Sequence, residues 1–327
     1  MEEITQESFA DVELAKFSSA VYSVKHEIGK VIVGQDASIE LMIAGLLSGG
    51  HVLLEGVPGI AKTLMAKLLA KSLSVNFSRI QFTPDLMPTD VTGTTVFNLQ
   101  RSEFTFNKGP VFSNFILIDE INRAPAKTQA SLFEVMEERQ ITVDGQSHKM
   151  DFPFFVIATQ NPIEQEGTYK LPEAQLDRFI FRIRMDYPSL AQEKMILTRF
   201  SEDFNLAVAN EVEPVLSASE LKKFQSLVEK IHIKEELIDY IAKITHATRN
   251  HGSIFLGASP RASLAILRTS KAMAALSGRS FVIPDDIRTV ALPVLNHRIL
   301  LTPEKEMEGI TADIVINEIT QTIEVPR

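Results

Sequence analysis

Cysteine and tryptophan are both absent from the 327 residues of this chain. Without cysteine the chain can form no disulfide, no thiolate zinc site and no cysteine nucleophile, and such a composition is typical of a reducing compartment. No apolar run approaches the roughly 20 residues that a membrane helix requires. The acidic segment MEEITQESFADVELAK at the start lacks the basic and apolar regions of a signal peptide. These absences predict a cytoplasmic protein without a membrane segment.

The chain also lacks an excess of positive charge. Its net charge of −9 disfavours a nucleic-acid partner, because binding to phosphates usually requires a basic face. A basic pore within an acidic molecule remains an open alternative. Hydrophobic residues make up 45% and charged residues 23%, as in globular proteins with a substantial core, and the length suits two domains.

Short apolar runs, some separated by helical patterns, predict an α/β fold with a largely parallel sheet covered on both faces. Two further segments predict β-hairpins, and the second contains the turn signal Asp144-Gly145. The strand pattern ends near Pro188 and helices follow. We therefore predict a nucleotide-binding α/β domain over residues 1–188 and a smaller helical lid domain over residues 189–327. The apolar runs are HVLLEG (51–56), FILIDE (115–120), FFVIAT (154–159) and FIFRIRM (179–185), and the hairpins lie in 93–109 and 139–150.

The segment GVPGIAKT (56–63) directly follows the first predicted strand. It matches the phosphate-binding pattern G-x-x-x-x-G-K-[ST], in which backbone N–H groups surround the phosphates of ATP. Lys62 would reach the outer phosphates and the Thr63 hydroxyl would bind Mg²⁺. Ala61 replaces the expected glycine, at a cost of about 1–2 kcal/mol if its φ is positive and almost none otherwise. The residues predicted to bind ATP here are Gly56, Val57, Pro58, Gly59, Ile60, Ala61, Lys62, Thr63 and Leu64.

Two adjacent acids, Asp119 and Glu120, end the second apolar run. At the carboxyl end of a strand both side chains would emerge where ligands bind an open α/β sheet. We predict that Asp119 holds Mg²⁺ and that Glu120 is the catalytic base that activates water. The next strand ends in ATQNP (158–162), where the amide of Asn161 could contact the γ-phosphate or orient the water.

Together with LPEAQLDRF (171–179) and GASPRAS (257–263), these motifs resemble those of AAA+ ATPases, and among them the MoxR family, over nearly the full length. The resemblance implies that Asn161 is sensor 1, that Arg178 is an arginine finger and that Arg261 is sensor 2. It places adenine near three residues that precede the second helix, and it identifies the segments near 81–112 and 139–150 as family inserts. The adenine residues are Val33, Gly34 and Gln35.

The resemblance also implies an activity and partners. Members of this family are ring-shaped homo-oligomeric ATPases, here expected to be hexameric, that remodel or activate client proteins. A partner with a von Willebrand factor A domain often takes part. ATP and Mg²⁺ are the implied cofactors.

The sequence around the two arginines supports their implied roles unequally. Arg178 could instead form an ion pair with Asp177 or Glu173. Arg261 follows Ser259 as helix cap and Pro260 as first helical residue. A cation in the first turn opposes the helix dipole, which indicates an anion nearby, although a surface arginine would tolerate the small cost.

Alternative functions are a nucleic-acid motor, a metal-chelatase motor subunit and, more distantly, a small-molecule kinase. The first insert contains two basic residues, Arg101 and Lys108, and three acids. It therefore has no excess of positive charge with which to bind phosphates. Phenylalanines alternate with polar residues in the same insert, and they either contact the client or pack on the core. The acids are Asp85, Asp90 and Glu103, and the phenylalanines are Phe97, Phe104 and Phe106.

Overall fold

The computed structural model describes residues 2–100, 102–162, 168–169, 171–201 and 212–326, with side chains from residue 12 onward. Arg101, which was counted in the charge of the first insert, therefore lies outside the described residues.

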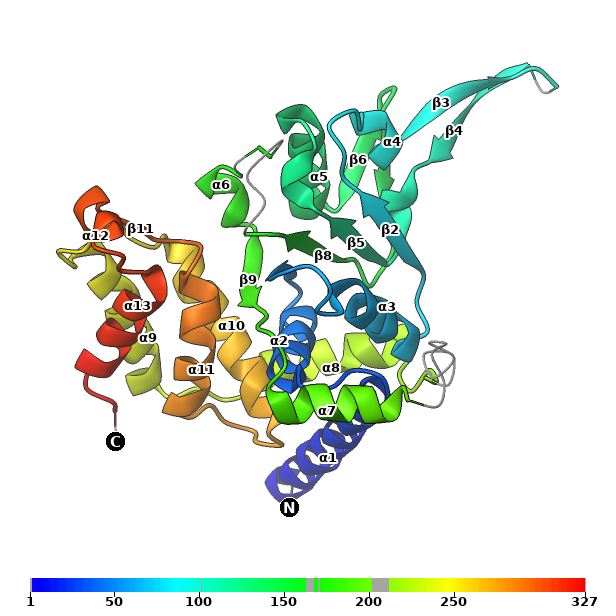
Figure 1. Ribbon diagram of the computed structural model, residues 1–327. Helices are drawn as coiled ribbons and strands as arrows, with labels where there is room; N and C mark the ends of the chain where they lie inside the picture. The colour runs from blue at the N-terminus through cyan, green and yellow to red at the C-terminus, as the bar shows by residue number, and fades with distance from the viewer. Residues whose placement is uncertain (1, 101, 163–167, 170, 202–211, 327) are drawn as a thin grey trace.

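Five parallel strands form the central sheet, in the order β2-β5-β8-β1-β9 (Figure 1). The predicted α/β fold with a parallel sheet is confirmed, and all four predicted strands are present. The edge strand β2 was not predicted. The strands are β1 (His51–Glu55), β2 (Phe77–Gln81), β5 (Phe115–Asp119), β8 (Phe155–Gln160) and β9 (Phe179–Arg184).

Alternate residues of each inner strand enter two different cores. Leu54 packs in a cluster with helices α1, α2 and α3, whereas Leu53 packs in a cluster with α5. Because both faces are covered, the inner strands consist almost entirely of apolar residues. The helices on these faces are α1 (Glu2–Gly29), α2 (Asp36–Leu47), α3 (Lys62–Ser72) and α5 (Ala126–Glu138).

Both predicted hairpins are present. Strand β3 (Gly93–Asn98) pairs with β4 (Glu103–Lys108), and this ribbon projects away from the body of the molecule (Figure 1). Strand β6 (Gln140–Val143) pairs with β7 (Gln146–Lys149) through the predicted Asp144-Gly145 turn, in which both residues have positive φ.

Helices dominate the chain after β9. Helix α10 packs on α2, and one hydrophobic cluster runs from α1 and α2 into α10 and α11. The boundary near Pro188 stays a prediction, since this cluster is continuous across it. In the part of the chain described here, no helix has the length and apolar character to cross a membrane. The helices are α7 (Leu190–Arg199), α8 (Ala218–Lys230), α9 (Glu235–Arg249), α10 (Pro260–Leu276), α11 (Pro284–Leu295), α12 (Pro303–Met307) and α13 (Ala312–Thr322).

Short elements complete the fold. They are α4 (Pro88–Thr92), the 3-10 helices η1 (Pro110–Phe112) and η2 (Ile121–Arg123), α6 (Glu173–Leu176), and the two-stranded sheet of β10 (Ile254–Leu256) and β11 (Leu300–Leu301).

The lowered pKa values of two buried histidines determine part of the pH dependence of stability. Burial lowers the pKa of His51 to about 4 from an ordinary value of 6.5, and burial and the charge of Arg298 lower the pKa of His297 well below its ordinary value. Below pH 6.5 the unfolded chain therefore binds more protons than the folded one, and stability falls as the pH falls toward 4. For His51 alone we expect a loss of about 2 kcal/mol in the free energy of unfolding between pH 7.5 and pH 5. Chemical denaturation at a series of pH values measures this loss, and His51→Gln should reduce its slope. An unchanged slope in the variant would contradict the assignment.

Candidate functional site

The phosphate loop lies between the end of β1 and the start of α3, as the motif requires. Lys62 is the first residue of α3, and its Nζ donates a hydrogen bond to the Gly56 carbonyl at 2.5 Å. Ala61 has φ 64 and ψ 22, in the left-handed region. This is the conformation in which a residue with a Cβ atom carries the cost of about 1–2 kcal/mol.

Asp119 ends β5 beside this loop. Its Oδ1 accepts a hydrogen bond from the Thr159 hydroxyl at 2.6 Å, and its Oδ2 lies 3.4 Å from the Thr63 hydroxyl. A carboxylate and a hydroxyl this close together could both bind one Mg²⁺ ion, which takes oxygen ligands in octahedral geometry. Arg79 also contacts Oδ2, at 2.7 Å from its Nη2, so a positive charge already stands at this carboxylate.

Glu120 engages other partners than Asp119 does. Its carboxylate Oε2 accepts a hydrogen bond from Gln81 Nε2 at 2.9 Å and lies 3.0 Å from Arg123 Nε. Its backbone has φ 57, again left-handed, and its N–H donates to the Thr159 hydroxyl at 3.0 Å. The two carboxylates thus lie in different surroundings, as separate roles for metal binding and catalysis would require.

The sequence reasoning missed Arg79 and Gln81, because it did not predict β2. Along this edge strand Ile80 and Phe82 are buried while Arg79 and Gln81 are exposed. That alternation with a period of two is the signal that could have located the strand. Asn161, predicted as sensor 1, directly follows β8 and is buried at this same edge of the sheet.

The segment predicted to hold adenine is joined to the phosphate loop through the chain after β9. Gln35 Nε2 donates to the Asp186 carbonyl at 3.1 Å, and Met185 N donates to the Glu55 carbonyl at 2.8 Å. Gly34 has φ 79, and a Cβ atom there would lie 2.6 Å from the Gln192 side chain of α7. Val33 precedes this glycine. The role of these three residues in binding adenine stays a prediction.

Arg178 and Arg261 lie on the opposite side of the sheet from the phosphate loop, at the amino ends of the strands. Arg178 immediately precedes β9, whereas Arg184 at its end pairs in register with Glu55, the residue before the phosphate loop. At about 3.3 Å per residue, Arg178 stands about 20 Å from the loop along the strand. The structure therefore does not bring these arginines to the phosphate loop of the same chain.

Both arginines contact one acid, Glu137 of α5. Arg261 Nη2 lies 3.2 Å and Arg178 Nε 3.9 Å from its carboxylate, and Arg178 Nη1 donates to the Phe133 carbonyl. Among the described residues, Arg178 thus pairs with Glu137 and not with the alternative partners Asp177 or Glu173, and Asp177 pairs with Arg298. The anion expected near Arg261 is, within this chain, Glu137.

A cavity of about 350 Å³ lies beside these arginines, at the amino ends of the strands. Arginines outnumber acids among its lining residues, so its electrostatic potential favours an anion. The charged lining residues are Arg139, Arg178, Arg261, Arg268, Arg298, Glu137 and Asp177.

Comparison with known proteins identifies the family. Residues 51–181 match the ATPase family associated with various cellular activities (AAA), and residues 246–319 match the AAA lid domain. The chain is 45% identical over 310 residues to "Chaperone MoxR1" of Mycobacterium tuberculosis, which covers 92% of this chain and 81% of the relative. The chain belongs to the MoxR family of AAA+ ATPases.

Two further proteins match over most of their length. An uncharacterised protein of Bacillus subtilis, YeaC, is 46% identical over 304 residues, covering 93% of this chain and 94% of that protein. A crystal structure from Cytophaga hutchinsonii, described as a candidate ATPase, superposes with a TM-score of 0.90 at 42% identity, covering 98% of this chain and 99% of that one. The similarities in sequence and in fold therefore agree over most of the chain.

The left-handed conformation of Ala61 generates a prediction. We expect Ala61→Gly to raise the free energy of unfolding by about 0.5–1 kcal/mol, because glycine removes the conformational cost but adds freedom to the unfolded chain. The matched control is Gly59→Ala, since Gly59 has φ 85 and nothing lies within 4 Å of where its Cβ would be. That change should destabilise through backbone conformation alone. Denaturant unfolding of both variants measures the effects, and a destabilised Ala61→Gly would show that the loop is not strained.

Proposed function

We propose that this chain hydrolyses ATP in the cytoplasm at sites shared between neighbouring copies in a ring, expected to be a hexamer, and uses the energy to remodel client proteins. The observation that carries the proposal is the separation of the phosphate loop from Arg178 and Arg261 at opposite edges of one sheet. Arg178 is about 20 Å away along the strand, and Arg261 contacts the same acid as Arg178, so a triphosphate bound by another subunit is the one that these arginines would reach.

The residues suggest the following division of labour. Lys62 and the loop amides would bind the phosphates, and Thr63 and Asp119 would hold Mg²⁺, which neutralises phosphate charge when bound. Glu120 would accept a proton from the attacking water, with Asn161 orienting that water. Arg178 and Arg261 of the adjacent subunit would leave Glu137 and stabilise the charge that develops on the transferred phosphoryl group.

Action on a client protein is supported by two features. One relative is named a chaperone, and the β3–β4 ribbon presents apolar side chains to solvent. Phe104 is 74% exposed and contacts Phe97 edge to face, with the ring centroids 5.1 Å apart, whereas Phe106 stacks on His148 with the centroids 4.5 Å apart. Phe106 thus packs between the hairpins, and Phe97 and Phe104 remain available for a client or a von Willebrand factor A domain partner.

A mixing experiment tests the shared site. Glu120→Gln leaves the arginines intact and Arg178→Ala leaves the phosphate site intact, so each variant alone should lose about 10³-fold or more in ATP turnover. A mixture of the two variants should regain a substantial fraction of the wild-type ATP turnover. In such a mixture some sites combine an intact Glu120 of one subunit with an intact Arg178 of its neighbour. Steady-state phosphate release, measured against protein concentration, gives the turnover.

Nucleotide binding to each variant serves as the control for folding. If Arg178→Ala alone hydrolysed ATP like the wild type at all concentrations, the shared site would be wrong. If mixing restored nothing while both variants still bound ATP and assembled, the arginine would act within its own subunit.

A further inference from the structure

A buried carboxylate stands directly before the phosphate loop. Glu55 is the last residue of β1 and is 6% exposed, and Gly56 begins the loop immediately after it. A charge this well buried must be paired and hydrogen-bonded to be tolerated. None of the roles assigned above to the nucleotide site explains why a charged residue is buried here.

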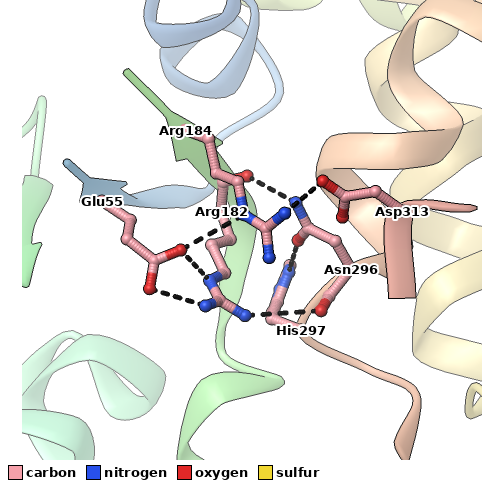
Figure 2. Close-up of polar contacts among 6 residues, drawn as sticks. All are labelled: Glu55, Arg182, Arg184, Asn296, His297 and Asp313. Carbon is pink, nitrogen blue, oxygen red and sulfur yellow. Dashed lines mark hydrogen bonds and ion pairs between the residues drawn. The ribbon is translucent and has the colours of Figure 1, made fainter. Parts of the chain in front are cut away.

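Two arginines of β9 provide the pairing (Figure 2). Arg182 donates to both carboxylate oxygens of Glu55, at 2.6 Å and 2.9 Å, in a two-point contact. Arg184 adds a third hydrogen bond at 3.3 Å. Two positive charges thus face one negative charge, and Arg184, which is partly exposed, has guanidinium nitrogens left for another acid.

The lid domain supplies what is missing (Figure 2). Arg184 Nη1 forms an ion pair with Asp313 in the first turn of α13. Asn296, which ends α11, donates from Nδ2 to the Arg182 carbonyl at 3.1 Å, and its own carbonyl accepts from Arg182 Nη1 at 3.4 Å. With Asp313, two acids balance two arginines, so the network is complete only when the lid is docked.

The same stretch of the lid also holds the other end of β9. Arg298, whose side chain is almost fully buried, pairs with Asp177 at 2.6 Å and donates to the Phe179 carbonyl at 2.7 Å. These two residues flank Arg178. Residues 296–298 therefore contact β9 both near the phosphate loop and around the arginine proposed to serve the neighbouring site.

We propose that Asp313 is a positioning residue for the phosphate loop, acting through Arg184 and Glu55, and that this chain of ion pairs couples nucleotide binding to docking of the lid. The inference deepens the proposed function and rests on it. When Asp313 pairs with Arg184, Arg184 and Arg182 together fix the Glu55 carboxylate and with it the start of the loop. A nucleotide that orders the loop must, by the same coupling, tighten the lid.

The test compares Asp313→Asn, which removes the charge, with Asp313→Glu, which keeps it. Glu318→Gln is the matched control, because it removes an acid from the exposed face of the same helix. Two readouts are needed: ATP turnover, and hydrogen exchange of α13 in the full chain with and without Mg²⁺ and a non-hydrolysable ATP analogue.

We expect Asp313→Asn to lower ATP turnover and to weaken the affinity for the analogue about tenfold, a usual size for coupling between two sites. Lys62 and the loop amides remain, so the analogue should still bind. The analogue should protect α13 from exchange in the wild type, in Asp313→Glu and in Glu318→Gln, but not in Asp313→Asn.

Two results would overturn the proposal. One is an Asp313→Asn variant that matches Glu318→Gln in turnover and in analogue-dependent protection. The other is a variant that is only less stable, with the protection and the kcat of the folded protein unchanged, since Asp313 would then be structural. A wild type that neither binds the analogue nor hydrolyses ATP would instead remove the proposed function, and this inference with it.

Discussion

The polarity of the parallel sheet is the constraint on which the rest of the structure depends. Because all five strands run in one direction, the phosphate loop, Asp119, Glu120 and Asn161 lie together at the carboxyl ends of the strands. Arg178 lies at the amino end of β9, on the opposite side of the sheet. In this structure the direction of the strands keeps the two groups apart. The shared site that we propose therefore takes its arginines from a second copy of the same chain.

Strand β9 carries most of the consequences of this geometry. It is an edge strand, so only β1 pairs with it in the sheet, while α2 and α11 pack against it. Phe179, Ile180, Phe181 and Ile183 are buried in the two hydrophobic clusters. Polar contacts from the lid add to this packing, since Arg298 donates to the carbonyls of Phe179 and Ile180 and to the Asp177 carboxylate. The strand is thus held along its length by the lid as well as by the sheet, which suits an element that connects the phosphate loop with Arg178.

What the sequence could predict follows from how local each signal is. The phosphate loop and the Asp119-Glu120 pair were recognisable because each motif lies within a few residues of the strand that positions it. The pairing of Arg184 with Asp313 spans 129 residues, and no local pattern encodes it. The contact of Arg261 with Glu137 spans 124 residues and was likewise out of reach. Only the absent prediction of β2 was avoidable, since its alternating pattern is local.

Two residues with side chains, Ala61 and Glu120, adopt left-handed conformations on either side of the phosphate site. Each costs on the order of 1–2 kcal/mol, and such costs persist only where the surroundings impose the conformation. For Glu120 the Thr159 hydroxyl and Gln81 provide that restraint. For Ala61 the restraint comes from the hydrogen bond of Lys62 Nζ to the Gly56 carbonyl, from the start of α3 at the next residue and from packing against the hydrophobic cluster. The buried Glu55–Arg182 pair fixes the residue before the loop, so the strained residue lies in a loop that is held at both ends and across its middle.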